Sequence, residues 1–290
     1  MERFFTLFIN PVLNKEIKLR FRSFKSFLGI FFYLAICGLV SLAFIYIEST
    51  FGYGGFNATD SRNLFMVLAI GQLGLVTFMT PGLTAGAISG EREMQTLNIL
   101  LTTQQSSTSI VLSKLFSSLA FLVLMLFASL PLYSIVFLYG GVSPSMVVIT
   151  FGFQLLSMFT IGSLGVMFST IIRKTMIATI TTYAMMLFFL VGTLILFVIS
   201  LRFSMAYNPG SVSGGNEYLP YLFIMLNPIV TLFTIYEPSA FSYELQATGI
   251  EWPLWSGFVI SYFLIAIVAL IISIRRLRPS MKVKTRKKKE

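Results

Sequence analysis

The strongest constraint in this sequence is a long stretch without any charged side chain, which runs from Leu115 to Ile172. As one helix rising about 1.5 Å per residue, this stretch would far overrun a bilayer core of roughly 30 Å. It must therefore fold back once. Residues 139–144 (YGGVSP) supply the turn, because Gly and Pro end helices and tolerate tight backbone geometry. We predict two membrane-spanning helices here, joined by a short connection.

The composition of the whole chain indicates the same class of protein. Of its 290 residues, 56% are hydrophobic and 11% are charged, against roughly 45–50% and about 25% in soluble domains. Such a chain cannot hide its apolar surface in a water-soluble core. Inside a bilayer a helix satisfies its own backbone hydrogen bonds. We therefore predict an all-α integral membrane protein.

Further apolar runs of about 20 residues bring the number of predicted transmembrane helices to six. Their approximate bounds are 27–47, 64–88, 110–139, 145–172, 175–201 and 254–274. Between the last two lies segment 202–253, in which Leu219 to Tyr236 is uncharged and nearly long enough to cross. Pro220 and the Asn227-Pro228 pair disfavour a continuous helix there. We predict a re-entrant hairpin in this extracellular segment rather than a seventh crossing.

The distribution of basic residues sets the orientation, because Lys and Arg stay on the cytoplasmic side. With six spans, all of the 21 Lys and Arg residues except Arg62 and Arg202 lie on one side. Both termini are then cytoplasmic, in a multi-pass protein of the cell (plasma) membrane. The basic tail 275–290 directly follows the last span. We interpret it as a contact with anionic lipid headgroups rather than with nucleic acid.

Residues 1–26 precede the first span and are predicted to form an amphipathic helix on the cytoplasmic membrane surface. Asn10 is a favourable N-cap, and Pro11 suits the first helical position. Four apolar side chains recur at helical spacing along one face: Leu13, Ile17, Phe21 and Phe24. The alternative is a basic flank that only sets orientation, and the two interpretations are compatible.

The only sizeable polar segment predicted between spans on the cytoplasmic side is at residues 89–97. It carries Glu91, Arg92 and Glu93 in a row, in a chain that otherwise avoids charge. A short helix from Glu91 onward would place Leu97 against the membrane protein and offer polar side chains to a cytoplasmic partner. A solvated loop is the alternative.

Three glycines repeat at every fourth position before and within this segment, at Gly82, Gly86 and Gly90. Small residues at this spacing let membrane helices approach closely. Helix packing is the default interpretation. A subunit interface or a moving seam is the functional alternative.

Several kinds of site are excluded by residues that the sequence lacks. There is no histidine, the commonest general base and metal ligand. The one cysteine, Cys37, cannot form an intramolecular disulfide, and no phosphate-binding Gly-x-x-x-x-Gly-Lys-Ser/Thr loop occurs. Apart from Lys114 near the start of the third, the predicted spans contain no Asp, Glu, Lys or Arg, which argues against a proton-driven mechanism. We predict no catalytic, cofactor or metal site in this chain, so that ATP, if used, is bound by another polypeptide.

Two blocks of sequence resemble a known family. Residues 10–16 (NPVLNKE), and residues 81–93 (PGLTAGAISGERE) with Thr96-Leu97 and 110–114 (IVLSK) behind them, are similar to ABC transporter permeases of the type-2 exporter class. The second block is the more specific. Asn227-Pro228 also fits the pattern, and the resemblance covers nearly the whole chain.

The resemblance implies a six-span subunit that pairs with a second permease subunit, as a homodimer or heterodimer, and docks on two cytoplasmic ATPase subunits. These partners would bind ATP and Mg. The N-terminal helix would act as an elbow, and residues 219–236 would form short helices in the outer leaflet. The turn after the second span would contact the ATPase through Glu91, Arg92, Glu93, Thr96 and Leu97. Cargo varies widely in this family, and nothing in the sequence selects one.

Two other classes compete with an ATP-driven exporter. A membrane scaffold or sensor would recruit cytoplasmic proteins without moving a solute. An intramembrane enzyme is disfavoured by the missing histidine and the missing ionisable residues in the spans. Purification in mild detergent distinguishes an exporter from a scaffold or sensor, because an exporter is expected to retain an ATPase.

Overall fold

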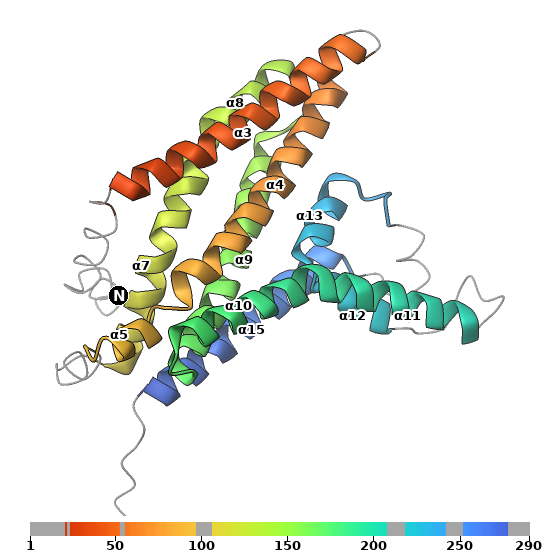
Figure 1. Ribbon diagram of the computed structural model, residues 1–290. Helices are drawn as coiled ribbons and strands as arrows, with labels where there is room; N and C mark the ends of the chain where they lie inside the picture. The colour runs from red at the N-terminus through yellow and green to blue at the C-terminus, as the bar shows by residue number, and fades with distance from the viewer. Residues whose placement is uncertain are drawn as a thin grey trace, which may run out of the picture.

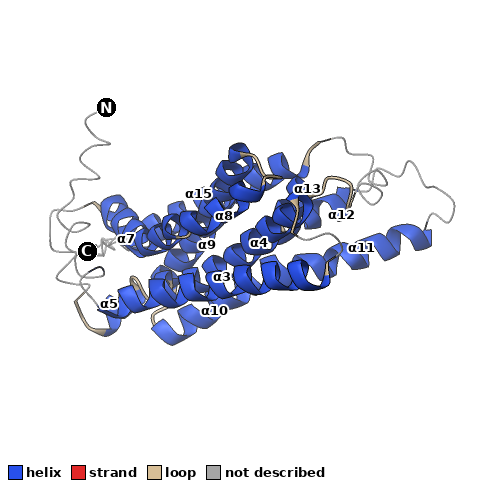
Figure 2. Cartoon of the chain, turned by 90° about the horizontal axis from the view of Figure 1, so that it is seen from above, coloured by secondary structure: helices blue, strands red, loops and turns tan. Residues whose placement is uncertain are grey.

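All regular secondary structure in the described part of the chain is helical. The computed structural model describes residue 21 and residues 24–52, 56–96, 106–207, 218–241 and 252–277, and these contain no strand (Figure 2). The helices are α3 (Phe24–Phe51), α4 (Ala58–Thr84), α5 (Ser89–Glu93), α7 (Ser107–Ala128), α8 (Leu130–Tyr139), α9 (Pro144–Ile171), α10 (Thr175–Leu187), the π-helix η1 (Phe188–Gly192), α11 (Thr193–Tyr207), α12 (Tyr218–Met225), α13 (Pro228–Tyr236) and α15 (Leu254–Leu277).

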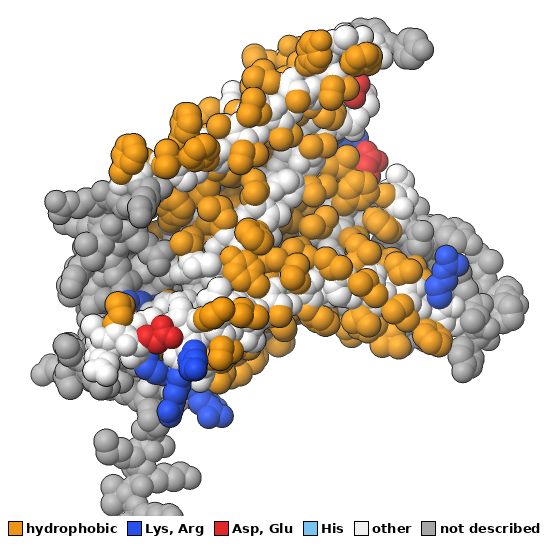
Figure 3. Space-filling view, in the orientation of Figure 1, with side chains coloured by type: hydrophobic (Ala, Val, Ile, Leu, Met, Phe, Trp, Pro, Cys, Tyr) orange, Lys and Arg blue, Asp and Glu red, His pale blue; other side chains and the backbone are white. Residues whose placement is uncertain are grey.

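Six helical units within these residues are long and apolar enough to cross a membrane, which confirms the predicted all-α, six-span class. Their bounds are Phe27–Phe51, Ala58–Glu93, Ser107–Tyr139, Pro144–Ile171, Thr175–Phe203 and Leu254–Leu277. In Figure 3 hydrophobic side chains cover the middle of the visible face, and Lys and Arg side chains gather at the end that carries α5. We call this the α5 end of the molecule. The fifth unit, formed by α10, η1 and α11, is called span five.

Two of the differences from the predicted spans have local causes. The second unit begins at Ala58 instead of 64, because Asn57 and Asp60 form a reciprocal capping box on a polar first turn. The third unit is divided at Ser129, where α7 ends and α8 begins with Pro131 in its first turn. Proline has no N–H for the preceding turn, so the predicted 110–139 helix becomes two.

Helix α9 lies at the centre of the bundle and contacts α4, α7, α10, α13 and α15. Its glycines allow the closest approach. A methyl group at Gly165 would lie 2.1 Å from the Thr84 hydroxyl oxygen, and one at Gly162 would lie 2.9 Å from Leu119 Cδ2. The glycine at 165 therefore allows the close approach of α4, and a side chain at 162 would require Leu119 of α7 to shift.

Between span five and α15, helices α12 and α13 form a pair bent by 93°. They lie at the opposite end of the bundle from α5 (Figure 1). The bend occurs at Asn227, which caps α13, and Pro228 begins that helix. The bend lies at the Asn227-Pro228 pair, where the sequence disfavoured one continuous helix. The placement of the pair in the outer leaflet stays a prediction.

The elbow residues are only partly within the described chain. Leu13 and Ile17 lie outside it, as does the tail beyond Leu277. Phe21 lines an apolar pocket together with Phe116, Phe159 and Phe263, whereas Phe24 is 79% exposed. Phe21 therefore lies beside a pocket between α7, α9 and α15, and the predicted elbow helix remains a prediction.

Candidate functional site

The predicted polar segment folds into a compact turn around α5. After α4 ends at Thr84, four residues turn the chain before α5 begins at Ser89. The Thr96 N–H and hydroxyl both donate to the Glu91 carbonyl, at 2.9 and 3.2 Å, and Gln95 adopts a positive φ of 58°. We call residues 89–96 the α5 turn. Leu97, the last predicted site residue, lies outside the described chain.

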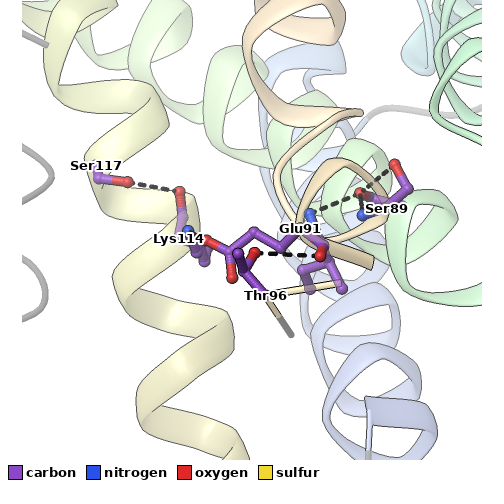
Figure 4. A network of polar contacts seen from close by, with 7 residues as sticks. Ser89, Glu91, Thr96, Lys114 and Ser117 are labelled. Carbon is purple, nitrogen blue, oxygen red and sulfur yellow. Dashed lines mark hydrogen bonds and ion pairs between the residues drawn. The ribbon is translucent and has the colours of Figure 1, made fainter. Parts of the chain in front are cut away.

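Glu91 ties the α5 turn to α7. Its carboxylate accepts a hydrogen bond from the Lys114 ammonium, and the side chains of Glu91 and Lys114 are only 19% and 12% exposed. Figure 4 shows Glu91 reaching across to Lys114 while Thr96 folds back on the Glu91 backbone. An ion pair shielded from water is screened less by salt than one on the surface, and removing one of its partners leaves a costly unpaired charge.

Arg92 and the start of α5 bind the end of α9. Arg92 Nη2 donates to the Thr170 carbonyl at 3.2 Å. The Ser169 hydroxyl accepts from the Ile88 and Ser89 N–H groups at 2.9 Å each. Since a helix start leaves backbone N–H groups without intrahelical partners, Ser169 acts here as a cap supplied by another helix.

Glu93 ties the turn to span five. Its carboxylate oxygens accept from the Thr175 N–H and hydroxyl, both at 2.8 Å. Thr175 is the first residue of α10, and the adjoining Lys174 provides no side-chain cap. These two hydrogen bonds from Thr175 lower the pKa of the Glu93 carboxyl below its usual value. Glu93 thus caps α10 in its ionised form.

The three predicted glycines face span five as well. A methyl group at Gly82 would lie 3.1 Å from the Tyr183 hydroxyl, one at Gly86 would lie 3.3 Å from Thr175 Cγ2, and one at Gly90 would lie 3.9 Å from Thr175 Oγ1. The glycines therefore bring α4 and α5 close to α10 within one chain. A role at a subunit interface stays untested.

The exposed part of the turn is its tip. Glu91 and Arg92 are partly buried, while residues 93–96 are exposed and the Met94 side chain is 69% exposed. Of the predicted site residues, the three charged ones, Glu91, Arg92 and Glu93, contact neighbouring helices through their side chains. The surface open to a partner consists of Glu93, Met94, Gln95 and Thr96.

The partners of the turn were not predicted as part of the site: Lys114, Ser169, Thr170 and Thr175. Lys114 is the only charged residue of its transmembrane helix, and the two neighbouring polar residues of α9 come just before Arg173. Polar residues at the end of an apolar helix are a weak signal for such contacts. Which of them meets which charge depends on helix packing.

The chain matches the family described as ABC-2 family transporter protein over residues 11–278. Because the match covers most of the chain, the protein belongs to this family, as the resemblance at residues 81–93 indicated. It is a multi-pass permease subunit of an ABC transporter, a class that associates with a membrane and an ABC ATPase. No curated protein sequence matches the chain.

Proposed function

We propose that this protein is the permease of an ATP-driven exporter, forms the translocation pathway as a dimer, and is driven through the α5 turn by a separate cytoplasmic ATPase. The ATPase supplies the ATP and Mg sites. The observation that carries the proposal is that Glu91, Arg92 and Glu93 connect one exposed tip to three different helices, α7, α9 and α10. A displacement of that tip would reach three membrane spans directly.

The charge distribution supports a cytoplasmic position for the α5 end. Arg173 and Lys174 are exposed beside the start of α10, and Arg275 and Arg276 occupy the last turn of α15. These basic residues follow the rule that places Lys and Arg on the inner side of a cell membrane. Both chain termini are then cytoplasmic, and the α12–α13 pair is on the outer side.

The mechanism follows from rigid connections. When ATP binding draws two ATPase subunits together, the two copies of the α5 turn would move with them, and α7, α9 and α10 would follow because their polar anchors are buried or doubly hydrogen-bonded. Such movement between discrete packed arrangements is how helical membrane proteins transmit a binding event. A scaffold or sensor has no need for these connections.

The test is a charge placed on the tip. Met94→Glu introduces a carboxylate on the exposed surface without touching an anchoring contact, and is expected to reduce retention of the ATPase during purification in mild detergent at least about tenfold. Thr59→Glu is the matched control, since Thr59 is exposed in the first turn of α4, at the opposite end.

Equal ATPase retention by both variants would disprove docking at the tip. If the unmodified chain purifies without any ATPase, the scaffold or sensor class is favoured instead.

A further inference from the structure

Span five contains a π-helical turn whose hydrogen bonds are completed by a residue from outside the span. At Phe188–Gly192 the helix widens, and the Thr193 N–H donates to the Phe188 carbonyl, five residues back. In an α-helix it would donate to the Phe189 carbonyl. Here the Thr193 hydroxyl donates to that carbonyl instead, at 2.7 Å. The wide turn is therefore stabilised by a side chain where a backbone N–H is missing.

The external residue is Asn227, at the bend between α12 and α13. Its Nδ2 donates to the Leu190 carbonyl at 2.7 Å and to the Thr193 hydroxyl at 3.1 Å. Asn227 is 1% exposed and Thr193 is 0% exposed. A π turn is frequently a functional feature of a helix. This one is joined directly to the outer pair of helices.

The other side of the same amide caps α13. Asn227 Oδ1 accepts from the Ile229 and Val230 N–H groups, both at 3.1 Å. A primary amide offers two donor hydrogens and two acceptor positions, and Asn227 uses all four. The reverse orientation of the amide would aim its N–H groups at backbone N–H groups, so the contacts fix it. One side chain thus joins span five to the first turn of α13.

The far end of α13 is anchored to other helices. The Tyr236 hydroxyl hydrogen-bonds the Thr150 hydroxyl of α9, and Arg62 of α4 pairs with Glu237 at 3.3 Å. The bend is also fixed, since Tyr262 on α15 donates to the Leu226 carbonyl at 3.0 Å. Asn227 is therefore the described hydrogen-bonding link from span five to α13, in a pair whose α12 also packs on α11 in an apolar cluster with Phe197 and Tyr221.

We propose that Asn227 is the positioning residue that couples span five to the outer helix pair, and that its hydrogen bonds select the π register of span five over a regular α-helix. In the α register the Thr193 N–H would donate to the Phe189 carbonyl. It would also rotate the two parts of the span by about 100° relative to each other and withdraw Thr193 from Asn227. Span five then has two discrete arrangements, and α13 is released from the π turn in one of them.

This inference rests on the proposed function for the source of movement. Glu93 and Thr175 would transmit the displacement of the α5 turn to the start of span five. The centre of the π turn, Leu190, lies fifteen residues after Thr175, roughly 22 Å along the helix axis. Asn227 would pass the movement to α13.

The experiment is hydrogen-exchange mass spectrometry on the full chain purified with its ATPase, with and without ATP. Asn227→Ser keeps a residue that caps helices well but is too short to reach Leu190. Thr193→Val keeps the branched shape and removes the hydroxyl. The matched controls are Asn57→Ser, which changes the cap of α4, and Thr181→Val, whose hydroxyl donates to the Ile177 carbonyl within span five.

Without nucleotide, Asn227→Ser is expected to speed exchange of the amides at residues 228–236 roughly tenfold, because two neutral hydrogen bonds are lost. The control variants should leave these amides unchanged. With ATP, the native chain should show a change in exchange there that is absent in both Asn227→Ser and Thr193→Val, while ATPase retention is unchanged. The double variant should behave like either single variant, because the two residues share one contact.

Native exchange at residues 228–236 in Asn227→Ser would overturn the link. A loosened pair that keeps the full response to ATP would overturn the coupling role. If Asn227→Ser does not insert into the membrane, Thr193→Val decides the same questions from the other side. If the native chain retains no ATPase, the proposed function fails, and the comparison without nucleotide still decides whether Asn227 holds the pair.

Discussion

Helix α9 and span five are apolar membrane-spanning units of nearly equal length, the first without charge and the second with Arg202 near its end, yet they occupy opposite environments. In α9, 67% of the most apolar stretch is buried in the bundle, against 22% in span five. The side chains buried by α9 include Gln154, Ser157, Thr160 and Ser163, all 0% exposed. Span five instead exposes large apolar residues such as Ile180, Leu187 and Val191. In this membrane protein, small and polar residues therefore lie in the core of the bundle, and the most hydrophobic helix surfaces face lipid.

The α5 turn and Asn227 show how a helix with so little buried surface is held. Span five is attached by Glu93 at its start, by Tyr183 and Thr175 against the glycines of α4, and by Asn227 at its π turn. Span five also packs on α9 through α10 and on α12 through α11, but it buries less of its surface than α9 does. The contrast identifies α9 as the core of the bundle and span five as a helix at its periphery.

The largest effect that would sharpen this contrast is expected from Gly165→Ala on α9. The added methyl group would collide with Thr84, whose hydroxyl is held by the Thr80 carbonyl at 2.8 Å. Overpacking should lower the free energy of unfolding by about 2 kcal/mol, measured by denaturation of the purified protein in detergent. The control is Gly152→Ala on the same helix, where an added methyl meets nothing within 4 Å. Equal stability of the two variants would contradict a tightly packed α9.

A smaller effect is expected when the aromatic side chains of span five are truncated. Phe189 is 3% exposed and its ring lies 5.8 Å from that of Tyr262, while the adjacent Phe188 is 44% exposed. Phe189→Ala should cost about 1–2 kcal/mol of packing in the same assay. Phe188→Ala should cost less, because lipid replaces the lost contacts. The reverse order would mean that span five is attached by its other face.

The smallest effect concerns the cap at the start of span five. Since hydrogen bonds from Thr175 lower the pKa of the Glu93 carboxyl, its stabilising effect is present above the ordinary pKa of glutamate. It is lost as the pH falls through the lowered pKa. Glu93→Gln should therefore lower the thermal midpoint slightly at neutral pH, with a difference that disappears in acid. Glu48→Gln in α3, remote from the cap, is the control. A pH-independent difference would show that the charge of Glu93 is not involved.

Much of the fold was predictable, because the bilayer imposes lengths and hydrogen bonding that a sequence must satisfy. The charge-free stretch from Leu115 to Ile172 required a hairpin, and the structure turns at Gly140 and Gly141, both with positive φ. The bend at Asn227 followed from the proline beside it. The start of α4 was missed, since a polar capping box extends the helix beyond its apolar part.

The site was predictable only in outline. The run of Glu91, Arg92 and Glu93 stood out because charge is rare in this chain, but an exposed role for all three did not follow. The structure directs two of them into contacts with Lys114 and Thr170, and leaves Met94 at the tip. Sequence spacing gives the face of a helix, whereas the identity of the neighbour depends on how helices cross.

The sequence by itself determined that this chain is a membrane protein with six spans, because hydrophobic length and the exclusion of charge from lipid are properties of the residues alone. Its match to the ABC-2 transporter family is likewise a property of the sequence. Only the tertiary structure decided that α9 is central, that span five contains a π turn, and that Asn227 joins this turn to α13. Those features depend on hydrogen bonds and close contacts between residues far apart in the chain.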